Sequence, residues 1–312
     1  MQFIRGLYNL RLQREECVAT IGNFDGVHLG HHAVLDQVKE SASSSGLVST
    51  VVIFEPQPIE YFAPDKAPSR LTRLREKLQQ FALHDIDRVV CLRFDEQLAS
   101  LSAEEFVDDV LLEGLAVKKL IIGDDFRFAK NREGDYQYLV NTAQNKGFET
   151  SKTNTFTLGT ERVSSTLIRQ ALASGDMLKA ARLLGRPYRI SGRVAHGEKR
   201  GRKMGFATAN IELHRYCSPV EGIFSGRVYG IDDTAYDAVI YVGSKPVFKG
   251  KRVLLEVHLL DFDDDLYGRH LQVELLEKLR SDIYFSSEQE LIDQIHVDIG
   301  HARESLKLNN KI

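Results

Sequence analysis

The sequence predicts an α/β unit with a parallel sheet over residues 1–185, followed by an antiparallel β-barrel with a C-terminal helix over residues 186–312. Three observations predict this division. Up to residue 185, apolar β-branched runs alternate with segments of helical periodicity, which is typical of a parallel sheet covered on both faces. Beyond Pro187, strand-like runs are separated by turns instead of helices, which is typical of an antiparallel barrel. Helical periodicity returns only in the last segment.

Composition narrows the class of protein. The 312 residues are enough for two hydrophobic cores, and 43% hydrophobic with 27% charged residues is ordinary for a soluble globular protein. Lys and Arg total 41 against 44 for Asp and Glu, so the chain has no excess of basic residues that would indicate binding to nucleic acid. No apolar run is long enough to cross a membrane, and no signal-peptide pattern is present. Three widely spaced cysteines, without a C-x-x-C pair, predict reduced thiols and a cytoplasmic location. No pattern indicates a particular oligomeric state.

Strands of the first unit are predicted where short apolar, β-branched runs end at glycine, proline or charged residues. These runs are Cys17 to Ile21, Val48 to Phe54, Arg88 to Leu92 and Lys119 to Gly123. Ligands of parallel sheets bind beyond the carboxyl ends of the strands, near the point where the strand order reverses. Gly22 and Gly123 each follow a predicted strand, so we expect their loops to line one crevice.

Helices of the first unit are predicted from apolar spacing and from start and stop signals. The apolar spacing involves Leu71, Leu74, Leu78 and Phe81 in one segment, and Phe106, Val110 and Leu111 in another. Ser102 and Glu105 precede the second segment with the spacing of a capping box. Met177 to Leu184 predicts a further helix, which ends at Gly185 with Pro187 beyond it.

The second unit is predicted from strand-like runs at 188–194, 222–229, 238–242 and 253–260. A helix is expected from about Ser287, where Ser287 and Glu290 have capping-box spacing. Leu291, Ile295 and Ile299 would form the apolar face of that helix.

The loop after the first predicted strand is the strongest candidate site. Gly22, Asn23, Asp25 and Gly26 form a turn between a strand and a helix entry, which presents backbone N–H groups to phosphate. His28 and His31 are three residues apart, so on a helix they share one face and could stabilise charge at an attacked phosphorus. Two alternatives stay open: a zinc pair, for which no third ligand is evident, and a pair without chemistry.

Two later segments also have the composition of phosphate-binding elements. Ser164-Ser165-Thr166 is a capped helix start, whose hydroxyl groups could cap the helix or meet a phosphate. Residues 197–205 form a basic, glycine-rich loop, which could be a solvated turn or a phosphate-binding flap. The run Asp263-Asp264-Asp265 is interpreted as a solvated turn and not as a metal site.

Several motifs in order extend over nearly the whole chain. They are Gly22-Asn23-Phe24-Asp25-Gly26-Val27-His28-Leu29-Gly30-His31, Gly123-Asp124-Asp125-Phe126-Arg127-Phe128, Ser164-Ser165-Thr166-Leu167-Ile168-Arg169, Gly185-Arg186-Pro187-Tyr188 and Thr208-Ala209-Asn210. The first resembles the G-x-F-D-G-x-H-x-G-H signature of nucleotidylyltransferases. The set as a whole resembles the bacterial bifunctional riboflavin kinase/FAD synthetases.

This resemblance implies that residues 1–185 form a Rossmann-like nucleotidylyltransferase domain, which joins FMN to the α-phosphate of ATP to give FAD and pyrophosphate. His28 and His31 would stabilise the transition state. Arg169 would neutralise the leaving pyrophosphate. The residues implied to bind the nucleotide in this half are Gly22, Asn23, Phe24, Asp25, Gly26, Gly30, Asp125, Arg127, Ser165, Thr166 and Arg169.

The resemblance also implies that residues 186–312 form a riboflavin kinase domain, which uses ATP and Mg²⁺ to make FMN. Gly197, Arg202 and Gly205 would bind nucleotide in the flap. Thr208 and Asn210 would hold Mg²⁺ through oxygen atoms, as a hard cation prefers. Glu256, predicted on one strand face with Leu254 and His258, would be the general base for the ribityl hydroxyl.

The chain departs from the family pattern at a few positions. Ala207 replaces a proline, Tyr241 an asparagine and Val247 a threonine, while Ala129 and Asn131 stand where glycines are common. Ala207, Tyr241 and Val247 favour one alternative, an FAD synthetase whose barrel is an inactive or regulatory flavin-binding module. A flavin-binding protein without enzymatic activity is a second alternative.

Overall fold

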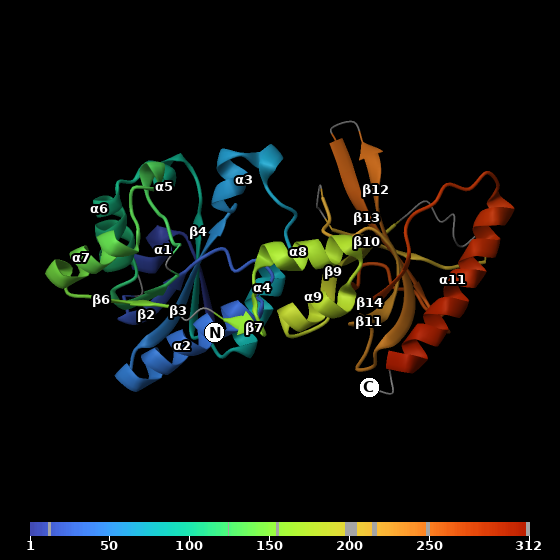
Figure 1. Ribbon diagram of the computed structural model, residues 1–312, viewed down its shortest axis with the longest axis horizontal. Coiled ribbons are helices and arrows are strands. Elements are labelled where there is room, and N and C mark those ends of the chain that lie inside the picture. The colour runs from blue at the N-terminus through green and yellow to red at the C-terminus, as the bar shows by residue number, and fades with distance from the viewer. Residues whose placement is uncertain are drawn as a thin grey trace. The chain divides into compact units, whose positions relative to one another are not determined.

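The structure is a computed structural model that describes residues 1–11, 14–123, 125–153, 156–196, 205–213, 217–247 and 250–309. By its internal contacts the chain divides into two compact units (Figure 1). The first unit comprises Met1–Pro68 and Thr72–Val163, and the second comprises Ser69–Leu71 and Ser164–Ile312. The assignment of residues 1–185 and 186–312 to two catalytic domains stays a prediction.

A six-stranded parallel sheet forms the centre of the first unit. Its strands are β1 (Gln2–Arg5), β2 (Cys17–Ile21), β3 (Val48–Glu55), β4 (Arg88–Arg93), β5 (Val117–Ile122) and β6 (Glu149–Lys152), with the order β1-β4-β3-β2-β5-β6. A separate hairpin is formed by β7 (Thr157–Leu158) and β8 (Glu161–Arg162). The predicted parallel sheet is therefore confirmed, whereas β1, β6 and the hairpin were not predicted.

The strand order places a topological switch point between β2 and β5. From β2 the chain proceeds outward through β3 and β4, and β5 then returns to pair with the other side of β2, with Ala19 opposite Leu120. Ligands of doubly wound sheets bind at this point, beyond the carboxyl ends of the strands. The loops that begin at Gly22 and Gly123 thus leave neighbouring strands at the switch point, as expected from the sequence.

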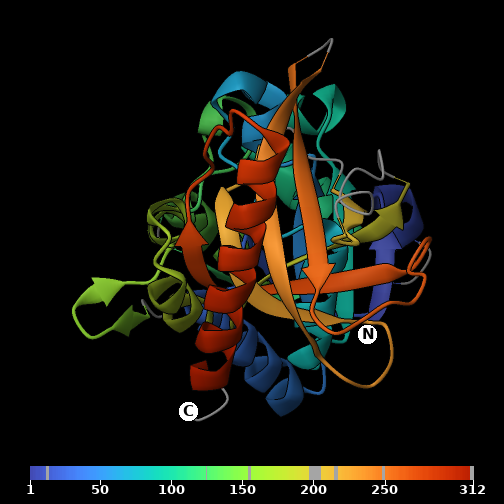
Figure 2. The ribbon, with the colours of Figure 1, turned by 90° about the vertical axis from the view of Figure 1, so that its right-hand side faces the viewer.

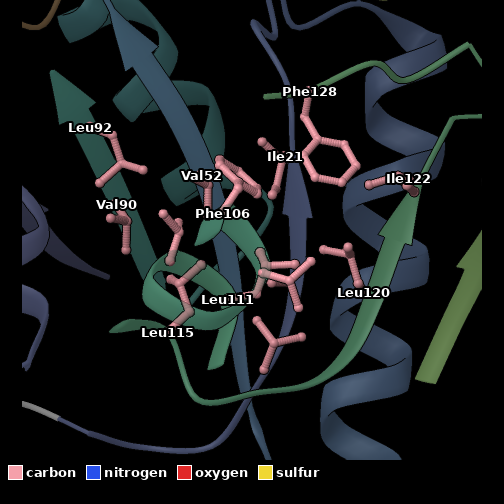
Figure 3. Close-up of a cluster of buried hydrophobic side chains, with 14 of the residues drawn as sticks. Ile21, Val52, Val90, Leu92, Phe106, Leu111, Leu115, Leu120, Ile122 and Phe128 are labelled. Atoms are coloured by element: carbon pink, nitrogen blue, oxygen red, sulfur yellow. The ribbon is translucent and has the colours of Figure 1, made fainter. Parts of the chain in front are cut away.

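Apolar residues of the sheet are buried on both of its faces. Ile21, Val52 and Leu120 belong to one core cluster, and the alternate residues Val51 and Ile121 belong to clusters on the opposite face. Figure 3 shows the first cluster, in which Phe106, Leu111, Leu115 and Phe128 pack against strand residues such as Val90 and Ile122. Because both faces of the sheet are buried, the sequences of these strands are nearly continuous apolar runs and do not alternate with polar residues.

Helices connect the strands of the first unit. They are α1 (Leu7–Arg11), α2 (Leu29–Ser45), α3 (Pro58–Phe62), η1 (Pro64–Lys66), α4 (Leu74–Leu83), α5 (Glu96–Ser100), α6 (Ala103–Glu105), the π-helical η2 (Phe106–Gly114), η3 (Lys130–Arg132) and α7 (Tyr136–Lys146). The capping box of Ser102 and Glu105 is confirmed. Leu71 lies before α4, so the expected helix begins later than the apolar spacing suggested.

The second unit is a closed antiparallel barrel with the strand order β10-β13-β12-β11-β14-β9. Its strands are β9 (Tyr188–Ala195), β10 (Ala209–Glu212), β11 (Gly222–Tyr229), β12 (Tyr236–Val247), β13 (Gly250–Leu259) and β14 (His270–Arg280). The predicted barrel is confirmed, although the sequence patterns had not identified β10 and β14. Closure leaves the sheet without an open edge.

Among the residues that the structure describes, the helices of the second unit are α8 (Ser165–Ser174), α9 (Met177–Leu184) and α11 (Glu288–Asn309). The bounds of α9 and its left-handed cap at Gly185 are as predicted. Helix α11 lies along the outside of the barrel (Figure 2) and contacts β11, β12 and β14. At its start the Ser287 hydroxyl accepts the Glu290 N–H as expected, and the Glu290 carboxylate also accepts hydrogen bonds from the Ser286 N–H and the Ser286 hydroxyl.

Candidate active sites

The loop between β2 and α2 has an unusual backbone conformation. Phe24, Gly26 and Val27 have φ angles of 46°, 90° and 40°. A positive φ suits glycine, but it is sterically strained for phenylalanine and more so for a β-branched valine. Such strain persists only where surrounding contacts fix the backbone, and it is concentrated at functional sites.

Asp25 contributes to fixing this loop. Its carboxylate accepts hydrogen bonds from the Thr72 backbone N–H at 3.0 Å and from the Thr72 hydroxyl at 3.3 Å. The same hydroxyl accepts the Gly26 N–H at 2.9 Å. Since Asp25 and Thr72 are both buried, these bonds attach the loop firmly to the segment before α4. Thr72 was not predicted, because no motif in the sequence marks it.

His28 and His31 meet at the start of α2. His28 is the N-cap residue, and its Nδ1 accepts the His31 N–H at 3.3 Å. Reciprocally, the His28 N–H donates to Nδ1 of His31 at 3.3 Å, and the two rings stack with their centroids 3.7 Å apart. A ring nitrogen that accepts a hydrogen bond carries no proton, so in both neutral imidazoles the hydrogen belongs on Nε2. Each Nε2–H is therefore a hydrogen-bond donor, and a phosphate oxygen, which only accepts hydrogen bonds, requires a donor as its partner.

The histidine pair is held by close packing. The Phe24 ring is buried, lies 4.9 Å from the His31 ring and packs edge-on against Phe81. A Cβ atom on Gly30 would lie 3.2 Å from two atoms of the His28 ring, and one on Gly22 would lie 3.2 Å from the Phe24 ring. The close approach of these rings thus favours glycine at positions 22 and 30.

The loop after β5 is held by aromatic contacts. Phe126 and Phe128 stack with centroids 5.6 Å apart, and Phe128 is buried. Asp125 and Arg127 are exposed, and the Asp125 carboxylate lies 4.0 Å from the Arg162 guanidinium on β8. Ala129 and Asn131 have φ angles of 66° and 54°. The loop therefore keeps the left-handed conformation that favours glycine at both positions, although neither is glycine.

Helix α8 begins at the predicted serine–threonine motif. The Ser164 hydroxyl accepts the Leu167 N–H at 3.2 Å, so Ser164 caps the helix while Ser165 and Thr166 lie in its first turn. Nε of Arg169 donates to the Ser69 carbonyl at 2.7 Å, which fixes the base of the guanidinium group. The positive end of the helix and Arg169 thus lie within one turn of each other.

A cavity of about 370 Å³ opens on the barrel. Thr208, Asn210, Phe262, Asp265, Leu266 and Tyr267 are among the residues that line it. Two segments far apart in the chain, Thr208-Ala209-Asn210 and the Leu266-Tyr267 turn, therefore line the same cavity. The acidic turn at 263–265 is exposed as expected, and it also contributes to the wall of this cavity.

Glu256 lies next to this cavity through strand pairing. Along β13, Leu255 and Val257 are buried in the barrel, whereas Leu254, Glu256 and His258 share the less buried face, in line with the predicted alternation. Asn210 of β10 is directly opposite Glu256. Directly opposite residues of an antiparallel pair point to the same side with Cβ atoms about 5 Å apart. The carboxylate and the predicted metal ligand are thus neighbours.

Two of the departures from the family pattern have a structural account. The Ala207 carbonyl accepts a hydrogen bond from Nδ1 of His258 at 2.9 Å, which holds the backbone before Thr208 although no proline is present. Strand β13 pairs with β10 on one side and with β12 on the other, and in β12 it is Tyr241 that lies opposite Glu256. The Tyr241 hydroxyl donates a hydrogen bond to Asp282 at 2.9 Å. Burial, this bond and the nearby carboxylates raise the pKa of Tyr241, so its phenol stays protonated.

Other predicted residues are not tested by these contacts. Gly205 has a φ of 90°, and no atom of the described residues lies within 4 Å of a Cβ built on it. Gly197 and Arg202 lie outside the described residues. Within the residues that the structure describes, no three His, Cys, Asp or Glu side chains form a metal-binding group. In the same part of the chain, no helix is long and apolar enough to cross a membrane.

Comparison with known proteins matches each half to a different family. The FAD synthetase family model matches residues 10–167, and the riboflavin kinase family model matches residues 184–306. The bifunctional riboflavin kinase/FMN adenylyltransferase of Escherichia coli K12 is 49% identical over 305 residues, which cover 97% of both chains. The protein of the same name from Pseudomonas fluorescens is 47% identical over 304 residues, again covering 97% of both.

A solved structure has the same fold over both units. A Streptococcus pneumoniae protein, described as a macrolide-efflux protein, aligns with a TM-score of 0.82 at 28% identity and covers 97% of this chain and 99% of its own. Together with the fold, these matches define a two-part transferase that acts on flavins and ATP. The chain belongs to the bifunctional riboflavin kinase/FMN adenylyltransferase family, and it carries both activities.

Proposed function

We propose that the two reactions are divided between the barrel and the parallel-sheet half, with Glu256 serving the kinase and the His28–His31 pair serving the adenylyltransferase. The observation that most strongly supports this division is the pairing of Asn210 with Glu256 beside the cavity that Thr208 lines. A proton acceptor and oxygen ligands for a phosphate-bound cation are thereby assembled within the barrel alone.

In the kinase reaction, Glu256 accepts the proton of the terminal ribityl hydroxyl as that oxygen attacks the γ-phosphorus of ATP. The bond from the γ-phosphorus to the bridging oxygen breaks, and ADP leaves. The Thr208 hydroxyl and the Asn210 amide oxygen are hard, neutral donors, which suit Mg²⁺ that is held largely by substrate phosphates. That ion would supply charge neutralisation on the transferred phosphoryl group.

In the adenylyl transfer, a phosphate oxygen of FMN attacks the α-phosphorus of ATP, and pyrophosphate leaves without a covalent enzyme intermediate. The Nε2–H groups of His28 and His31 donate to the phosphate oxygens on which negative charge develops. Their protons are already in place, because both Nδ1 atoms accept backbone hydrogen bonds. The family resemblance further implies Arg169 as the residue that neutralises the leaving pyrophosphate.

The remaining nucleotide contacts are part of the same proposal. Asn23, Asp125 and Arg127 are exposed on loops after β2 and β5, so they are open to a ligand. Asp25, in contrast, is buried and bonded to Thr72, so its contribution is to hold the loop shape. A cytoplasmic location is also proposed, supported by three cysteines that are all free thiols.

Two variants test the division of labour. Replacing His28 and His31 together by alanine should abolish FAD formation from FMN while FMN formation from riboflavin continues. Glu256→Gln keeps the volume of the side chain but removes the proton acceptor, so it should lower FMN formation by about 10²–10⁴-fold and leave adenylylation of supplied FMN intact. Equal loss of both products in either variant would contradict the assignment.

A further inference from the structure

We propose that His32 is a positioning residue of the adenylyltransferase site: it holds the strained Val27 carbonyl and thereby fixes His28. This inference depends on the proposed role of His28 in adenylyl transfer. His32 itself is not expected to touch either substrate.

The feature to be explained is the conformation of Val27. Its φ of 40° is unfavourable for a β-branched side chain, and the residue is fully buried directly before His28. Relaxation of Val27 toward a negative φ would rotate the peptide plane that joins it to His28. Because the His28 N–H in that peptide donates to His31, such rotation would also disturb the stacked histidine pair.

His32 supplies a contact that opposes this relaxation. Its Nε2 lies 2.9 Å from the Val27 carbonyl oxygen, and its backbone N–H donates to the His28 carbonyl, also at 2.9 Å. The carbonyl groups of two successive residues are thus held by one residue in the first turns of α2. A carbonyl can only accept, so Nε2 of His32 is the donor, and it remains a donor whether the ring is neutral or protonated.

The His32 ring is itself held in place from α4. Its centroid lies 4.3 Å from that of His84, the residue that caps the C-terminal end of α4. Nδ1 of His84 in turn lies 3.2 Å from an Asp36 carboxylate oxygen on α2. The contacts therefore run from α4 through His84 and His32 to the Val27 carbonyl, and they continue along the backbone to His28.

Glutamine and leucine at position 32 separate the effect of the hydrogen-bond donor from that of side-chain bulk. The glutamine amide N–H reaches about as far as Nε2 of histidine, whereas leucine has similar bulk and no donor. His32→Leu should lower kcat for FAD formation from FMN by about 10–100-fold, since small misplacement of a catalytic group has effects of this size. KM for FMN should change little. His32→Gln should recover most of the lost activity.

Three controls keep the outcome interpretable. FMN formation from riboflavin, measured on the same samples, reports whether the chain is folded and active elsewhere. His301→Leu, at an exposed position on α11, is the matched histidine replacement and should leave both activities unchanged. Full adenylyltransferase activity in His28→Ala would overturn the proposed role of His28 and, with it, this inference.

If His28→Ala is inactive, the His32 variants decide the inference by themselves. Loss in His32→Leu with recovery in His32→Gln supports the positioning role. Unchanged kcat in His32→Leu would overturn it, as would equal impairment of the leucine and glutamine variants, because the donor would then be irrelevant. A change in KM alone would also overturn it, since it would indicate a contact with the substrate.

Discussion

The tight approach of Gly30 to His28 leads to a quantitative prediction for Gly30→Ala. An added Cβ would lie 3.2 Å from two atoms of the His28 ring and 3.4 Å from the Val163 carbonyl oxygen. The ring cannot easily yield, because it is buried, stacked on His31 at 3.7 Å and bonded through Nδ1 to the His31 N–H. The substitution therefore shifts His28 by a few tenths of an ångström or breaks its cap.

Two opposing effects determine the stability of this variant. Alanine in place of glycine favours an α-helix by about 1 kcal/mol, whereas overpacking a tight site costs about 1–3 kcal/mol. The net loss in the free energy of unfolding is then at most about 2 kcal/mol, so the fold should persist. Displacement of His28 has a larger effect on the reaction, and we expect kcat for FAD formation from FMN to fall about 10–100-fold.

The assay measures FAD from supplied FMN and FMN from riboflavin on the same preparation, together with urea unfolding. Gly300→Ala is the matched control, because Gly300 lies within α11 with no atom near the added Cβ. It should raise the free energy of unfolding by about 0.5–1 kcal/mol and leave both activities unchanged. Wild-type FAD formation by Gly30→Ala would refute the reasoning, since His28 would then tolerate displacement.

Two more predictions concern the stability of the barrel and the reactivity of the thiols. Gly226→Ala would place a Cβ only 1.9 Å from the Glu274 carbonyl oxygen on β14, so the free energy of unfolding should fall by about 3 kcal/mol or more; ordinary urea stability would contradict this close backbone approach. Burial raises the pKa of the Cys17 thiol, so alkylation of the native protein should reach exposed Cys217 first, and peptide mass spectrometry that finds Cys17 modified equally fast would disprove it. Because that pKa is raised, the stabilisation by Cys17 is complete below its ordinary value of 9.0 and is lost as the pH rises above it.

Strongly periodic or capped elements were predictable from the sequence. The strand Cys17–Ile21 and the helix Met177–Leu184 were placed with their observed bounds, because burial on both faces and a left-handed glycine cap leave clear signals. The edge strands Gln2–Arg5 and Glu149–Lys152 were missed, since edge strands are short and carry little apolar pattern. In β14, polar and apolar residues alternate from His270 to Leu275, so a strand signal was present in the sequence although the alternation is lost from Leu276 onward.

The candidate sites were only partly predictable for a similar reason. Motif spacing identified His28, His31 and Glu256, but it could not show that the two histidines cap α2 through each other. Nor could it identify Thr72 and His32, which act through contacts with loop atoms and have no motif of their own. The meeting of Thr208 with the Leu266-Tyr267 turn depends on closure of the barrel, which is a property of the tertiary fold.

The central claim is that the protein makes FMN from riboflavin and then converts that FMN to FAD. A chromatographic time course of the wild-type protein with riboflavin, ATP and Mg²⁺ tests it most directly. The account predicts that FMN appears first and FAD follows as FMN accumulates. Untouched riboflavin, in a sample that still converts supplied FMN to FAD, would contradict the kinase assignment of the barrel, and no product from either flavin would contradict both assignments.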